Sequence, residues 1–147
     1  MSSKVKPVTE DRQTVTPYLT IRNAAAALEF YKQVFGATEK MRMAEPDGKV
    51  GHAEIEIGKT RIMISDEYPE LDVLGPESRG GTTAGLHLLV EDVDAVFSTA
   101  VAAGAKELKP VSDQFYGERS GKLADPFGHG LCLIEFIGRG YDEIATG

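Results

Sequence analysis

The chain has 147 residues, of which 41% are hydrophobic and 27% charged, a composition typical of one globular domain. A single cysteine, Cys132, excludes an intramolecular disulfide and a cysteine-rich zinc finger, and the formal net charge of −7 argues against nucleic acids and anionic membranes as partners. No apolar run approaches the roughly 20 residues of a membrane span, and residues 1–14 lack the apolar stretch of a signal peptide, so we expect a cytoplasmic protein.

The first half of the chain predicts one strand, one helix and three further strands. Residues 1–14 are polar and mixed in charge, and we expect them to form a flexible arm. The alternating segment 18–21 predicts a strand, and Asn23 then offers an N-cap for an amphipathic helix over 24–35 that ends at Gly36. Turn residues separate the remaining predicted strands, which cover 39–44, 52–57 and 61–65.

The same order of elements recurs 69 residues later. Leu19 corresponds to Leu88 and Asn23 to Asp92, and a second helix follows Asp92 and stops at Gly104. The other strands of this copy are predicted over 86–90, 107–111, 118–124 and 131–136. Each half is therefore a βαβββ unit, the first over 15–66 and the second over 85–138, with a linker over 67–84 and a tail over 139–147.

The predicted fold class is α+β, with two tandem βαβββ units whose curved mixed sheets surround a cleft for a small ligand. A helix covers one face of each sheet, so alternate strand residues point to the other face and to the cleft. Next to an aromatic run, the planar fork of Arg119 could clamp an anionic group. We predict a ligand pocket formed by Tyr18, His52, Glu54, Met63, His87, Tyr116, Arg119 and Cys132.

Each of these residues also has a structural interpretation. His52, Glu54 and His87 could form a two-histidine, one-carboxylate metal site, or His52 and Glu54 could simply belong to a solvated strand face. His87 could contact a ligand or bond a neighbouring side chain, and Tyr18 could contact a ligand or pack between the units. Arg119 could instead pair with a nearby carboxylate. We interpret Cys132 as a small buried residue because no Cys-His motif supports catalysis.

Several motifs resemble those of the vicinal oxygen chelate superfamily, which includes glyoxalase I, bleomycin resistance proteins and extradiol dioxygenases. They are Pro-Tyr-Leu at 17–19, Glu-Phe-Tyr at 29–31 in an alanine-rich helix, and Asp-Pro-Phe-Gly-His at 125–129. The runs Gly-His-Ala-Glu at 51–54 and Gln-Phe-Tyr-Gly-Glu-Arg at 114–119 resemble the PhnB-like branch. The resemblance covers residues 15–138 and implies the same paired βαβββ fold.

Metal-using members of this superfamily hold a divalent ion with four inward side chains, usually His and Glu. The resemblance assigns these positions to Thr16 or Tyr18, to Met63, to Gly85 or His87, and to Cys132. Thr16, Met63 and Gly85 are poor ligands for such an ion, so the usual ligand set is not matched. Whether the protein uses a divalent metal ion as a cofactor is an open question at this point, and His52, Glu54 and His87 are the candidate ligands.

The resemblance implies a glyoxalase/bleomycin-resistance-like protein that binds a small molecule between its units, and it implies a homodimer. Two functions remain open at this point. The first is a metal-dependent lyase, isomerase or dioxygenase, whose catalytic residues the sequence does not assign. The second is a metal-free protein that binds and sequesters a drug or metabolite.

Overall fold

The structure is a computed structural model that describes residues 11–138. The predicted tail over 139–147 and most of the predicted arm over 1–14 therefore lie outside the described residues. Within the described range, no helix is both long enough and apolar enough to cross a membrane.

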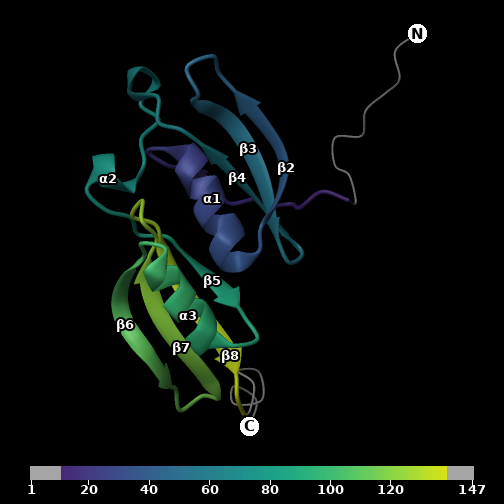
Figure 1. The fold of residues 1–147 in the computed structure, drawn as a ribbon, viewed down its shortest axis with the longest axis vertical. Helices are drawn as coiled ribbons and strands as arrows, with labels where there is room; N and C mark the ends of the chain where they lie inside the picture. Colours follow the sequence, from purple (N-terminus) through teal and green to yellow (C-terminus); the bar gives the residue numbers. More distant parts are fainter. Residues whose placement is uncertain (1–10, 139–147) are drawn as a thin grey trace.

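Each half of the chain folds into a four-stranded sheet with one long helix on one face, which confirms the predicted paired βαβββ fold (Figure 1). The sheets have the strand orders β1-β4-β3-β2 and β5-β8-β7-β6, and only the β1–β4 and β5–β8 pairs are parallel. The first unit contains β1 (Tyr18–Thr20), α1 (Ala24–Phe35), β2 (Thr38–Ala44), β3 (Val50–Ile57) and β4 (Thr60–Ser65). The connection holds a short 3-10 helix (Pro69–Leu71) and α2 (Pro76–Arg79). The second unit contains β5 (Gly85–Leu89), α3 (Val93–Ala102), β6 (Lys106–Asp113), β7 (Glu118–Ala124) and β8 (Gly130–Phe136).

The repeat extends to the side chains that begin the two helices. Asn23 and Asp92 each accept a hydrogen bond from a first-turn backbone N–H, at 3.3 and 3.1 Å, as their predicted N-cap roles require. An acidic residue at the end of the last strand adds a second acceptor in each unit. Asp66 accepts from Ala24 N at 3.1 Å, and Glu135 accepts from Val93 N at 2.9 Å.

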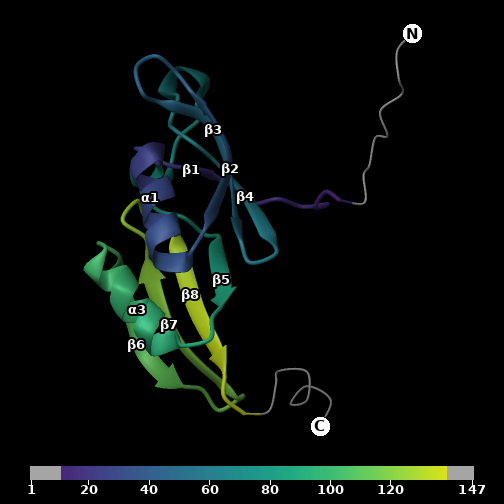
Figure 2. The ribbon, with the colours of Figure 1, turned by 45° about the vertical axis from the view of Figure 1, so that its right-hand side comes forward.

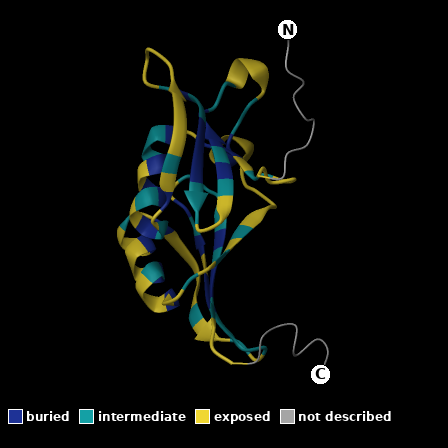
Figure 3. Ribbon diagram, turned by 90° about the vertical axis from the view of Figure 1, so that its right-hand side faces the viewer, coloured by how far each residue is buried: buried dark blue, intermediate teal, exposed yellow. Residues whose placement is uncertain are grey.

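The core lies between each helix and its sheet. Tyr31 and Ile55 are fully buried in the first unit, as are Val93 and Leu133 in the second. Gly121 permits a close approach, because a Cβ atom there would lie 2.7 Å from Cε2 of Phe97. Burial follows the central strands and the helix faces that meet them, while the edge strands β2 and β6 are largely exposed (Figure 3).

Two hydrogen bonds between the units, one buried and one partly buried, join them. The Tyr31 hydroxyl on α1 donates to Asp125 Oδ2 at 2.6 Å, in the turn between β7 and β8. In the same turn, His129 Nε2 donates to the carbonyl oxygen of Thr20 at 3.1 Å. With the units held in this way, α1 and α3 lie on the same side of the molecule, and no described helix covers the opposite face of either sheet (Figure 2).

Candidate functional site

The uncovered face of the first sheet carries polar side chains in its centre. Ala53 and Ile55 are fully buried against α1, so the intervening residues of β3 point to the opposite face. His52 and Glu54 lie there, as strand alternation predicts, together with Tyr18 from β1 and Arg61 and Met63 from β4. We call this surface the open face of the first sheet.

A continuous chain of hydrogen bonds crosses this open face. The Tyr18 hydroxyl lies 2.7 Å from His52 Nδ1, and His52 Nε2 lies 3.0 Å from Glu54 Oε2. The other oxygen of Glu54, Oε1, accepts from Arg61 Nη1 at 3.0 Å. Because an ionised carboxylate can only accept, Nε2 of His52 carries the proton, and Nδ1 accepts from the Tyr18 hydroxyl. The structure thus joins three of the predicted pocket residues by hydrogen bonds, and a fourth, Met63, lies beside them on the same face.

Glu54 is the electrostatic centre of this network. It is only 8% exposed although no helix lies over it, because its neighbours close around the carboxylate. The hydrogen bond from His52, supported by that from Arg61, lowers the pKa of Glu54 against the opposing effect of burial. Glu54 therefore stays ionised and holds the imidazole of His52 in one tautomer, which in turn fixes the hydroxyl of Tyr18.

Three methionines surround this polar chain. Met63 pairs in register with both Tyr18 and Glu54, while Met41 pairs with Glu54 and Met43 with His52. Met43 is 59% exposed and Met41 is 36% exposed. Thioether side chains adapt to varied ligands and make favourable contacts with aromatic rings, so they form an apolar border around the polar centre.

The corresponding face of the second sheet has a different character. His87, Cys132, Lys122 and Lys109 are successive register partners across β5, β8, β7 and β6. Burial raises the pKa of Cys132, and the positive charges of the two lysines oppose that shift. A raised thiol pKa does not favour a nucleophile. A hollow of about 170 Å³ lies at this row, lined in part by His87, Lys122 and Cys132.

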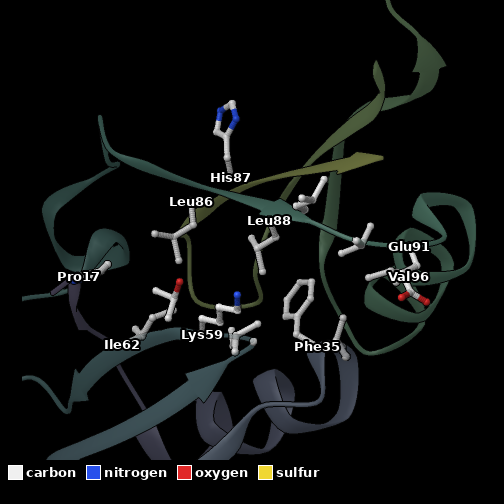
Figure 4. A pocket seen from close by; sticks show the side chains of 15 residues that line it. Pro17, Phe35, Lys59, Ile62, Leu86, His87, Leu88, Glu91 and Val96 are labelled. Atoms are coloured by element: carbon white, nitrogen blue, oxygen red, sulfur yellow. The ribbon is translucent and has the colours of Figure 1, made fainter. Parts of the chain in front are cut away.

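A larger hollow of about 740 Å³ lies between the two units. A cleft between the units was predicted, but its walls differ from the prediction. Of the eight predicted pocket residues, only His87 lies along it, and its ring points away from the hollow while Leu86 and Leu88 point into it (Figure 4). The reason is that the units meet through the helix-facing sides of their strands, so the predicted polar positions lie on two separate sheet faces.

Tyr116 and Arg119 lie away from both sheet centres. Tyr116 stacks edge-to-face on Phe115 at a centroid distance of 5.0 Å in the turn between β6 and β7. Arg119 donates twice to Asp94 on α3, each at 2.9 Å, and once to Asp113 at 2.8 Å. These carboxylates raise the pKa of Arg119 and hold its guanidinium on the helix-covered side, where it ties α3 to the sheet.

The residues at the metal positions do not form a ligand set within one chain. Tyr18 pairs with Met63 and His87 with Cys132, so the positions themselves are strand neighbours, but each pair belongs to a different sheet. Among residues 11–138, no three His, Cys, Asp or Glu side chains gather where they could hold a metal ion. The candidate metal ligands His52, Glu54 and His87 do not come together, because His52 bonds Glu54 on the first sheet while His87 lies in the second unit.

Sequence reasoning missed Met41, Met43 and Lys122 as parts of these faces. Two register shifts in β2, one on each side of the methionines, break the simple alternation that would have assigned their face. The available signal was their spacing of two residues next to a strongly alternating partner strand. Lys122 could have been found from Leu123, whose burial against α3 fixes the opposite direction for its neighbour.

The model of the "Glyoxalase/Bleomycin resistance protein/Dioxygenase superfamily" matches residues 13–133. The chain belongs to this superfamily. An uncharacterized protein of Mycobacterium tuberculosis is 42% identical over 122 residues, covering 81% of this chain and 72% of that protein. A Mycobacterium bovis relative has the same identity and is covered over 80% of its length.

Solved structures of other proteins share the fold over most of this chain. A Pseudomonas aeruginosa protein matches with a TM-score of 0.69 and 22% identity, covering 86% of this chain and 100% of that one. A Bacillus cereus PhnB protein matches with a TM-score of 0.67 and 21% identity, covering 84% and 99%. At these identities the likeness establishes the fold, and the function has to be argued from the site.

Proposed function

We propose that this superfamily member binds a small planar organic molecule on the open face of its first sheet. The main support for this proposal is the buried carboxylate of Glu54, which lies on a sheet face without a covering helix and orients the Tyr18 hydroxyl through His52. Such a network resists rearrangement, and a site that is already ordered loses less entropy when a ligand binds.

The chemistry of the face indicates the class of ligand. The Tyr18 proton is directed to His52, so the lone pairs of the phenol oxygen are the groups offered to a ligand. Half of Tyr18 is exposed, and Met41 and Met43 flank the same region. The expected ligand is a planar aromatic molecule that lies on the methionines and donates an N–H or O–H to Tyr18.

A second copy of the chain would close this open site, in line with the homodimer that we expect. The second sheet offers a complementary surface, because the repeat places Lys122 beside Cys132 where the first unit has Glu54 beside Met63. A face centred on a carboxylate would then meet a face centred on two lysines. Analytical ultracentrifugation should show a dimer that the Lys122→Glu variant weakens, and a monomer at all concentrations would contradict this arrangement.

Observations favour a binding protein over a metal-dependent enzyme. Tyr18, Met63, His87 and Cys132 make a poor set for the hard or borderline ions that carboxylate and histidine sites hold. Metal analysis of protein purified without chelator distinguishes the two functions. Binding alone predicts well under one equivalent of metal per chain, whereas about one equivalent that is lost in the His87→Ala variant would favour the enzyme.

Calorimetric titration tests the binding proposal with indole, a small planar molecule that carries one N–H donor. We expect saturable binding, weakened about fivefold to tenfold by Tyr18→Phe, since a hydrogen bond of about 1 kcal/mol is lost. Tyr68→Phe is the matched control, because Tyr68 also loses a bonded hydroxyl but lies away from the open face, next to Glu45. Equal affinities in the wild type and the Tyr18 variant would contradict the proposal.

A further inference from the structure

The hollow between the units has the size of a ligand site. Its volume of about 740 Å³ falls within the range of roughly 300–1,000 Å³ that is usual for small-molecule pockets. The first unit contributes Phe35 and Ile62 to its walls, and the second unit contributes Leu86, Leu88 and Val96. We call this space the inter-unit hollow, and it is separate from the open face of the first sheet.

The lining of the inter-unit hollow leaves apolar surface incompletely buried. Leu88 is only half-buried, whereas its repeat counterpart Leu19 is 8% exposed beneath α1. Leu86, Phe35 and Val96 are half-buried as well. An apolar occupant that covers these side chains would be stabilised by about 25 cal/mol for every Å² of apolar surface removed from water.

A cation lies over this apolar lining. Lys59 occupies the tight turn between β3 and β4, and its amino group points into the inter-unit hollow (Figure 4). Within the part of the chain that the structure describes, Lys59 forms no side-chain ion pair or hydrogen bond. Glu91, the acidic residue of the lining, lies beyond Leu88 on the other side of the hollow (Figure 4). An anionic group would therefore be oriented toward Lys59 and away from Glu91.

The shape favours a small molecule over a protein partner. Residues of both units line the inter-unit hollow, and its volume of about 740 Å³ suits a small molecule that contacts both units at once. We propose that the inter-unit hollow binds an apolar carboxylate, with its hydrocarbon body among Leu86, Leu88 and Phe35 and its carboxylate at Lys59.

Calorimetric titration of the full chain with 2-naphthoate and with neutral 2-naphthol tests the two parts of this site separately. We expect one naphthoate to bind per chain. The Lys59→Met variant keeps the apolar stem and removes the charge, so it should weaken naphthoate about threefold to tenfold and leave naphthol within twofold. Equal weakening of both probes, or of neither, would overturn the role of Lys59.

A pair of tryptophan substitutions in the second unit tests the location. Leu88→Trp fills the inter-unit hollow and should weaken both probes at least tenfold, whereas Val101→Trp, at an α3 residue that is 42% exposed and does not line the hollow, should leave both within twofold. Circular dichroism establishes that each variant is folded, and Lys59→Met keeps the proposal testable if Leu88→Trp is not.

Other occupants would give different results. Loss of naphthoate binding in Tyr18→Phe would place the probe on the open face and overturn the proposal. A wild-type dimer that Leu88→Trp converts to a monomer would assign the inter-unit hollow to a second copy. Naphthoate affinity that rises at least tenfold when residues 2–10 are deleted would assign it to the amino-terminal segment. Absence of saturable naphthoate binding to the wild type would also overturn the proposal.

Discussion

The hydrogen bond between Tyr31 and Asp125 should be a main tie between the two units, and Tyr31→Phe removes it with little change in shape. Tyr31 is fully buried and Asp125 is 3% exposed, so water cannot replace the lost donor. The substitution leaves Asp125 Oδ2 without this donor, while Oδ1 keeps its bonds from the backbone N–H groups of Phe127 and His129 at 2.9 Å.

The expected loss of stability follows from the charge and burial of this bond. A hydrogen bond to a charged group contributes about 1.5–3 kcal/mol, and the buried oxygen left unpaired places the loss toward the upper end, at about 2–3 kcal/mol. For a chain of this size that corresponds to a fall in Tm of about 5–10 °C. Urea unfolding followed by circular dichroism measures the free energy directly.

The pH dependence gives a second, independent readout. Burial and then the charge of Asp125 raise the pKa of Tyr31 well above its ordinary value of about 10. Below pH 10 the difference between wild type and variant should be constant. Above it the unfolded tyrosine ionises and the folded one does not, so the wild type loses its advantage by about 1.4 kcal/mol per pH unit until the folded pKa is reached.

Tyr68→Phe is again the control, because its hydroxyl bonds Glu45 at the surface and its loss should leave the urea midpoint nearly unchanged. A Tyr31→Phe variant as stable as this control, or a gap that does not narrow above pH 10, would refute the reasoning.

Three further predictions concern packing, capping and the open face. Gly121→Ala should destabilise the protein by about 1–3 kcal/mol in urea unfolding, because the new methyl group would lie 2.7 Å from Phe97; full stability would contradict the close packing. Asp66→Ala removes an acceptor used by three backbone N–H groups and should cost about 2–4 kcal/mol, against about 1 kcal/mol for Glu135→Ala, which loses one; equal costs would contradict the cap assignment. Glu54→Gln should reduce the loss of stability at acid pH. Because the pKa of Glu54 is lowered from 4.5 in the folded protein, its ionised carboxylate stabilises the wild type at pH values above 4.5, and this contribution is lost as the pH falls through the folded pKa. Curves of unfolding free energy against pH that run parallel for the two proteins below pH 5 would contradict the network.

The repeat made the fold predictable from sequence. The helix expected over 24–35 has those bounds in the structure, and the offset of 69 extends to the acceptors Asp66 and Glu135. These features are local or periodic, since caps lie beside their helices and strand alternation follows from the backbone. The side of the sheet on which His52 and Glu54 lie was predictable for the same reason.

The arrangement of the faces was not predictable in the same way. Alternation assigns His52 and His87 to uncovered faces, but it does not say whether two such faces belong to one cleft. The partner of Arg119 is likewise remote, because Asp94 lies 25 residues earlier on a different element. The face of β2 on which Met41 lies was not predictable because of the register shifts in that strand, since one extra residue exchanges the two faces of a strand.

The most direct test of the proposed function locates ligands with the methionines themselves. Three of the four methionines of the chain, Met41, Met43 and Met63, lie on the open face, so ¹³C-methyl-methionine NMR reports on that face. In a screen of small planar aromatic fragments, we predict a set of hits that shifts the signals of Met41, Met43 and Met63 and that Tyr18→Phe weakens. A screen in which no fragment shifts these three signals would contradict a ligand site on the open face of the first sheet.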